Sequence, residues 1–144
     1  MRLTDLMIGD IVHINNKELG YEHDAIVLSI EPSFVGVKYI DSSEDDLDQF
    51  AVRMIEPIVL DRATLIHNGL EESYDKDYDN NRYYLNCSSF CSSHKILLLT
   101  SSKIDTYFFK TNNRYVHIKY IHELQHLLRL IGEHELADNF KLIR

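Results

Sequence analysis

Residues 119–132 carry the most regular pattern in the chain, and this pattern predicts an amphipathic helix over about 119–131. Apolar side chains recur there every three or four residues, at Ile121, Leu124, Leu128 and Ile131. This spacing places them on one face of an α-helix, and Gly132 follows where the helix is expected to end. Because a helix with one apolar face must bury it against another layer, the rest of the chain has to supply a sheet or further helices.

Five short β-strands are predicted before residue 61. They cover residues 7–14, 25–30, 34–40, 50–54 and 55–60, and residues 15–24 and 41–46 read as polar loops between them. Pro57 lacks a backbone N–H and confines the last segment to an edge of the sheet. Short strands separated by turns at these intervals favour a small barrel or a curled sheet.

The second half begins with a short helix and continues as strands. Asp61 stands at the N-cap position of this helix and Gly69 at its end. The acidic residues 71–81 read as the hinge between the two halves. Strands are predicted at 83–87, 95–100, 106–110 and 114–118, and the tail, 133–144, fits either a strand or a helix.

These elements make the predicted fold class α+β. We expect a small N-terminal β-barrel over residues 1–60 and a short linking helix. The unit over residues 61–144 is then an antiparallel β-meander packed by one amphipathic helix. Packing of both halves as a single domain is the alternative.

Two resemblances follow from these segments. Gly9-Asp10-x-Val12-x-Ile14, residues 25–30 and Val35-x-Val37-x-Tyr39 resemble an SH3-like barrel of the KOW or Tudor kind, which implies binding of RNA or of protein segments. A wider resemblance covers most of the chain. It is carried by short segments such as Ile55-Glu56-Pro57-Ile58-x-Leu60, Asn68-Gly69 and Tyr120-Ile121-His122-Glu123-Leu124-Gln125. The chain resembles a family of small uncharacterised proteins from gut-anaerobe genomes, prophages and conjugative elements. That resemblance implies a mobile-element context and no particular chemistry.

The charge balance and the cysteine content limit the class of partner. The net charge is −8, whereas a protein that follows a phosphate backbone needs a basic stripe. The balance therefore argues against nucleic acid and favours a basic protein partner, with residues 41–48 and 71–79 as the acidic surface. The chain shows no signal peptide and no run of roughly 20 apolar residues, and it has two Cys. We expect a soluble, cytoplasmic protein with free thiols and no membrane partner.

The pentapeptide His122-Glu123-Leu124-Gln125-His126 matches the H-E-x-x-H pattern of zinc metallopeptidases. In such enzymes the two histidines, one helical turn apart, bind zinc, and the glutamate acts as the general base. One hypothesis is therefore a zinc cofactor held by His122 and His126, with Glu123 as the catalytic residue.

Three features favour a structural helix face instead. A third ligand is expected six residues past His126, where the chain has Gly132. His122 and His126 are predicted to point away from the apolar face, into solvent. Lys119 and Arg129 are predicted to lie beside the two histidines on the solvent-exposed face, and their fixed positive charges would repel a zinc ion. We prefer no metal and no catalytic residue here, and expect an exposed, mildly basic stripe suited to an anionic partner.

Two further segments resemble metal sites. Residues 75–80 place carboxylates at alternate positions, as in a calcium loop, but Asn86 stands where a bidentate Glu is required. An acidic linker is the preferred interpretation. Cys87, Cys91 and His94 form a possible zinc set without a visible fourth ligand, so free thiols are preferred.

The sequence has no glycine-rich phosphate loop, no G-x-S-x-G motif and no evident Cys–His nucleophile pair. Our preferred hypothesis is a non-enzymatic accessory binding protein of a phage or mobile element, without a cofactor. A minimal zinc metallopeptidase that uses the H-E-x-x-H pentapeptide is the alternative. A third hypothesis is nucleic-acid binding through the barrel.

Overall fold

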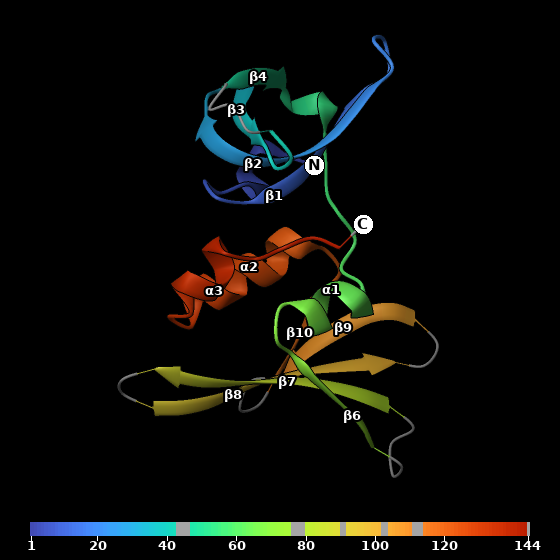
Figure 1. Cartoon of the computed structure of the whole chain (residues 1–144), viewed down its shortest axis with the longest axis vertical. Helices are drawn as coiled ribbons and strands as arrows, with labels where there is room; N and C mark the ends of the chain where they lie inside the picture. The colour runs from blue at the N-terminus through green and yellow to red at the C-terminus, as the bar shows by residue number, and fades with distance from the viewer. Residues whose placement is uncertain (43–46, 76–79, 90–91, 102–103, 111–113, 144) are drawn as a thin grey trace. The chain divides into compact units, whose positions relative to one another are not determined.

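The computed structural model describes residues 1–42, 47–75, 80–89, 92–101, 104–110 and 114–143, with the backbone alone described at 73–75, 80–89, 92–101, 104–106 and 110. The chain divides into two compact units, Met1–Ile58 (unit 1) and Val59–Arg144 (unit 2). Each unit contains an antiparallel sheet, and unit 2 also contains the α-helices (Figure 1). The predicted α+β class is confirmed.

Unit 1 is built on an antiparallel sheet with the strand order β4-β3-β2-β1-β5. Its strands are β1 (Ile11–Asn16), β2 (Tyr21–Ile30), β3 (Phe34–Tyr39), β4 (Asp48–Ala51) and β5 (Ile55–Glu56). A 3-10 turn, η1 (Leu3–Asp5), precedes them, and a second, η2 (Val52–Met54), leads from β4 to β5. Ile55 of β5 pairs with Ile14 of β1, so the last strand of the unit returns to the first.

The core of unit 1 lies on one face of this sheet. Val12 is opposite Ala25, and Val27 is opposite Val37, in the antiparallel register. Because alternate residues of a strand point to the same face, these positions share one side of the sheet. Their buried apolar side chains form one cluster: Leu6, Val12, Ile14, Ala25, Val27, Val35, Val37 and Ile55.

Three predictions for unit 1 need correction. Residues 15–24 are not a polar loop, because Asn16 pairs with Tyr21 and closes a hairpin between β1 and β2. Asn15 and Asn16 belong to β1 and residues 21–24 to β2, so that only residues 17–20 form the turn. The strand predicted at 50–54 is β4 followed by η2, and the strand predicted at 55–60 ends at Glu56, before Pro57.

Unit 2 contains a meander in which each strand pairs with the next, in the order β10-β9-β8-β7-β6. The strands are β6 (Glu71–Asp75), β7 (Asn80–Ser89), β8 (Ser92–Ser101), β9 (Ile104–Lys110) and β10 (Tyr115–Ile118). The predicted antiparallel meander is confirmed. The hinge predicted at 71–81 is wrong at both of its ends, since Glu71–Asp75 is strand β6 and pairs with Asn80 to Tyr84 of β7; residues 76–79 lie outside the described residues.

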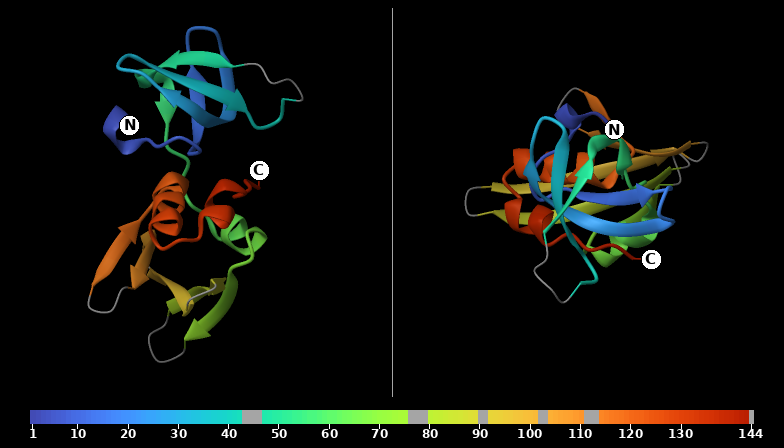
Figure 2. Two further views of the ribbon diagram at one scale, coloured as in Figure 1. Left: turned by 90° about the vertical axis from the view of Figure 1, so that its left-hand side faces the viewer. Right: turned by 90° about the horizontal axis from the view of Figure 1, so that it is seen from above.

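The helices of unit 2 lie on one side of its sheet, as Figure 1 and the left view of Figure 2 show. They are α1 (Arg62–His67), α2 (Ile121–Leu130) and α3 (His134–Asp138). The tail that fitted either a strand or a helix therefore contains a helix. The buried apolar side chains of the helices and of the facing strands form the interior of the unit: Leu65, Tyr107, Phe109, Ile118, Ile121, Leu124, Leu128 and Ala137. No helix in the described part of the chain is long and apolar enough to cross a membrane.

Local hydrogen bonds and two glycines fix the start of α1 and the ends of α1 and α2, and they confirm the sequence predictions for these two helices. The backbone N–H of Thr64 donates to Asp61 Oδ1 at 2.8 Å, which caps α1. Gly69 follows α1 with φ 85°, and Gly132 follows α2 with φ 92°. This left-handed backbone favours glycine and lets the next amide bond back into the helix, as Glu133 does to the Leu128 carbonyl at 2.8 Å.

Candidate functional site

The glutamate of the H-E-x-x-H pentapeptide lies in the first turn of α2. Glu123 is the third residue of the helix, and its Oε2 atom accepts hydrogen bonds from the backbone N–H of Lys119 at 2.8 Å and of Tyr120 at 3.1 Å. The first amides of a helix have no partner within the helix, and a glutamate at this position supplies one. The carboxylate that a peptidase would use as its base therefore serves to start the helix.

The first histidine of the pentapeptide does not face solvent. His122 is 5% exposed, and its ring stacks on Tyr120 with the centroids 5.7 Å apart. The rings of His122 and His126 are T-shaped to each other, with their centroids also 5.7 Å apart. The prediction that His122 points into solvent is wrong. His126 is half-buried.

The exposed basic stripe predicted along α2 is absent from the described residues, because α3 packs against that flank of the helix. Arg129 Nε donates to Asp138 Oδ1 at 3.3 Å, and the Arg129 side chain is only 15% exposed. Gln125, on the same flank, donates from Nε2 to the carbonyl of Ala137 at 2.9 Å. Lys119 remains exposed, with Nζ 5.2 Å from the centroid of the Tyr120 ring.

The described residues bring together no metal-ligand set. Over the ranges that the structure describes, no group of three or more His, Cys, Asp or Glu side chains is arranged to hold a metal ion. The calcium-type segment falls largely on residues 76–79, outside the described residues. Cys91 is also outside them, whereas Cys87 and His94 are opposite each other in the register of β7 and β8.

Substitution of Glu123 separates the helix-capping role from the catalytic one. We expect Glu123→Ala to lower the free energy of unfolding by about 1 kcal/mol, because two backbone amides lose their acceptor. Glu123→Gln keeps an acceptor and is expected to lose less than about 0.5 kcal/mol. Urea titration followed by circular dichroism measures both values.

A catalytic Glu123 predicts that Glu123→Ala and Glu123→Gln behave alike in activity. In that case both variants would be equally inactive in a peptidase assay, and protein purified without a chelator or a His-tag would carry about one equivalent of zinc, since structural and catalytic zinc binds tightly. Less than about a tenth of an equivalent of zinc would remove the peptidase hypothesis.

The charge of the protein is divided unequally between the two units. Residues 1–58 contain twelve Asp and Glu against four Lys and Arg, whereas residues 59–144 contain eleven of each. The whole formal charge of −8 therefore belongs to unit 1. Summed over a surface, such an excess attracts groups of the opposite sign.

Four rings of unit 1 form a second candidate site, which we call the aromatic cluster: Tyr21, His23, Tyr39 and Phe50. The Tyr21 centroid lies 4.4 Å from that of His23 and 5.9 Å from that of Tyr39. Phe50 lies 6.4 Å from Tyr39 and 6.5 Å from Tyr21. His23 is exposed and the other three side chains are half-buried, so the cluster reaches the surface.

A carboxylate borders the aromatic cluster. The hydroxyl of Tyr39 donates to Asp48 Oδ2 at 2.5 Å. Burial, and then the hydrogen bond to Asp48, raise the pKa of the Tyr39 hydroxyl well above its ordinary value, so Tyr39 is a neutral donor at neutral pH. Asp48 is exposed, and a carboxylate can accept several hydrogen bonds, so it retains capacity for a ligand.

The sequence prediction missed this cluster because it placed Tyr21 and His23 in a loop. A usable signal was present. Tyr21 and His23 continue the alternation that leads to Ala25 and Val27, and residues two apart in a strand share a face.

Comparisons of the chain with known protein families, with curated proteins and with solved structures found no match.

Proposed function

We propose that this protein is a non-enzymatic binding module whose unit 1 contacts a basic surface of a protein partner. The division of charge carries this proposal: unit 1 holds the entire net charge of −8, and unit 2 is balanced. A field of one sign speeds the encounter with a partner of the opposite sign and disfavours a phosphate backbone.

We further propose that unit 1 is an SH3-like barrel. The order β4-β3-β2-β1-β5, in which the last strand returns through η2 to pair with the first, supports this. A register shift between Val27 and Ser29 also supports it, because such irregularities let a strand bend between two parts of a curled sheet. Domains of this size can present binding surfaces without any catalytic group.

An accessory role in a phage or mobile element completes the proposal. It rests on the family resemblance carried by phrases such as Asn68-Gly69 and the stretch 120–125. Within that role the natural partner would be a protein with a surface rich in Lys and Arg.

The test uses the whole chain and an octalysine peptide as the basic probe. Glu18 and Glu22 are exposed acids of unit 1, and Glu71 and Glu135 are exposed acids of unit 2. We expect Glu18→Gln with Glu22→Gln to weaken peptide binding by about threefold to tenfold, as the loss of two exposed charge pairs predicts. Fluorescence anisotropy at low salt measures the dissociation constant.

The matched control is the pair Glu71→Gln and Glu135→Gln, which removes the same charge from unit 2. We expect it to change the dissociation constant by less than about twofold. If both pairs weaken binding equally, or if octalysine does not bind at low salt, the proposal is wrong.

A further inference from the structure

The aromatic cluster and Asp48 lie on one face of the unit 1 sheet, beside its core. Tyr39 is opposite Ala25, and Asp48 is opposite Val37. Both residues therefore lie on the face of the sheet that carries the buried core side chains. Tyr39 and Phe50 pack against the core cluster. Rings from β2, β3 and β4 therefore cover the end of the core, where it reaches the surface.

The cluster is a surface platform and not an enclosed cage. A group held between two rings needs about 7 Å between them, or two contacts of roughly 3.5 Å. The pair nearest to parallel, Tyr21 and Phe50, has centroids 6.5 Å apart at 19°, and the Tyr39 ring packs against both of them in a T-shaped arrangement. A ligand has to lie over the rings.

The sign of the ligand follows from the surroundings. Aromatic faces attract cations, Asp48 adds a carboxylate at the margin, and unit 1 carries the excess of negative charge. A planar guanidinium suits this arrangement better than an ammonium, because it stacks flat on rings and pairs with a carboxylate through two N–H groups.

We propose that the aromatic cluster and Asp48 bind the guanidinium group of an arginine in the basic protein partner. This inference rests on the proposed function and adds the side chain that the surface selects. The arginine stacks over Tyr21 and His23, and its N–H groups donate to Asp48, which also accepts from Tyr39.

The experiment compares labelled octaarginine and octalysine peptides on the whole 144-residue chain by fluorescence anisotropy. Both peptides have the same charge, so their ratio of affinities isolates recognition of the guanidinium. We expect octaarginine to bind about fivefold more tightly, a ratio typical of one exposed cation–π contact with a carboxylate beside it. Tyr21→Leu is expected to lower the ratio to about twofold or less, because the stacking face is lost.

A second variant keeps the test valid if Tyr21→Leu unfolds unit 1. Asp48→Asn retains an acceptor for Tyr39 but removes the charge. It is expected to lower the ratio of the octaarginine affinity to the octalysine affinity by about half. Asp41→Asn is its control, because Asp41 is exposed and carries the same charge outside β3 and β4.

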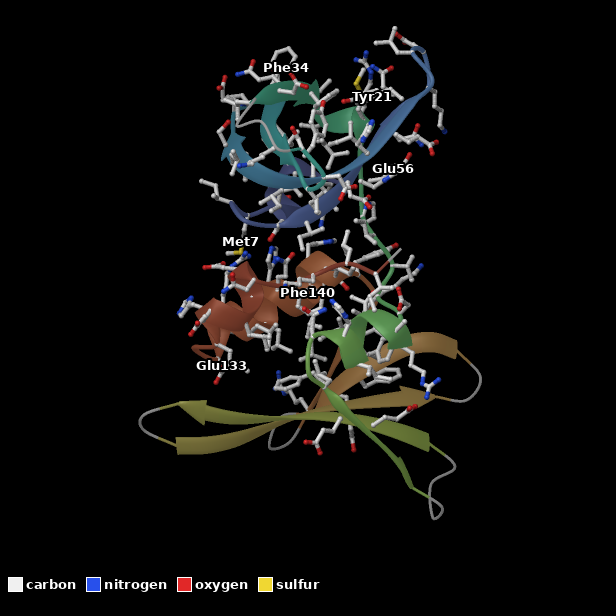
Figure 3. All side chains as sticks on the ribbon, viewed as in Figure 1. Met7, Tyr21, Phe34, Glu56, Glu133 and Phe140 are labelled. Carbon is white, nitrogen blue, oxygen red and sulfur yellow. The ribbon has the colours of Figure 1, made fainter. Side chains whose placement is uncertain are left out.

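Phe34→Leu is the control for Tyr21→Leu. Phe34 is 47% exposed and begins β3, and Figure 3 shows its side chain well apart from that of Tyr21 on unit 1. Both control variants should leave the ratio unchanged.

Three results would overturn the arginine site. Equal binding of the two peptides, with no effect of the variants on either, would contradict the arginine site but leave the proposal of a basic protein partner intact. Binding of neither peptide at low salt removes both proposals. Tight binding of an oligouridine that Tyr21→Leu abolishes would assign the rings to base stacking instead.

Discussion

Replacing Ile14 with alanine is expected to remove most of the stability of unit 1. Ile14 is 0% exposed and lies in the single described core cluster of the unit. Truncation of a buried isoleucine to alanine costs about 2–5 kcal/mol, because apolar contacts are lost and a cavity remains. A core of this size rarely supplies more than about 3–5 kcal/mol. A large fraction of the variant is therefore expected to have unit 1 unfolded at 37 °C.

Amide hydrogen exchange of β1, β2 and β3 measures this effect strand by strand. Leu19→Ala is the matched control, since Leu19 lies in the turn between β1 and β2 and is 80% exposed. Its effect should be within about 0.5 kcal/mol of zero. Protection factors that remain unchanged in Ile14→Ala would show that the core of unit 1 is not the cluster around Ile14.

Replacing Gln125 with alanine is expected to destabilise unit 2 by about 2–4 kcal/mol. Gln125 is 0% exposed, and its amide donates to the Ala137 carbonyl at 2.9 Å, which ties α2 to α3. The substitution leaves a cavity and also a buried carbonyl without its donor. Both penalties fall on the same helix pair.

A second substitution separates these two penalties. Gln125→Leu keeps about the same volume and removes the polar contacts of the amide, among them the bond to Ala137, so it is expected to cost about 1–3 kcal/mol. Leu130→Ala is the control, because Leu130 is 83% exposed on the same helix. Urea titration gives each free energy of unfolding, and equal values for Gln125→Ala and Leu130→Ala would contradict the buried link.

The helix ends were predictable because their signals are local. Asp61, Gly69 and Gly132 each act within four residues of their own position, so their identities are enough to place a cap or a stop. The hairpin of β1 and β2 was not predictable in the same way. Its partners, such as Asn16 and Tyr21, are polar or amphipathic, so the alternation of Tyr21 and His23 is a weaker signal than a run of apolar residues, and the pairing of the two strands completes it.

The buried face of α2 shows where periodicity stops being informative. The apolar residues Leu124 and Leu128 correctly marked its centre. The burial extends further, to Gln125, because α3 packs on the flank where Gln125 and Arg129 bond to Ala137 and Asp138. His122 is also buried, beside the rings of Tyr120 and His126. That contact joins a helix to a tail segment, and no pattern within residues 119–131 encodes it.

The aromatic cluster depends on contacts of the same kind. Tyr21, Tyr39 and Phe50 come from three strands, and their distances follow from the register of two strand pairs. A sequence gives the residue types but not the register, because a shift by one position would turn every side chain to the other face.

The placement of Glu123 at the start of α2 has a consequence for pattern searches in general. The H-E-x-x-H sequence alone does not determine the role of its glutamate, which depends on how far the motif lies from the first turn of its helix. In the first turn the backbone amides compete for the carboxylate, as those of Lys119 and Tyr120 do here. Deeper in a helix the amides already have partners, and the carboxylate can turn to water. Proteome-wide searches for zinc peptidases should therefore gain selectivity if they require at least one helical turn before the first histidine.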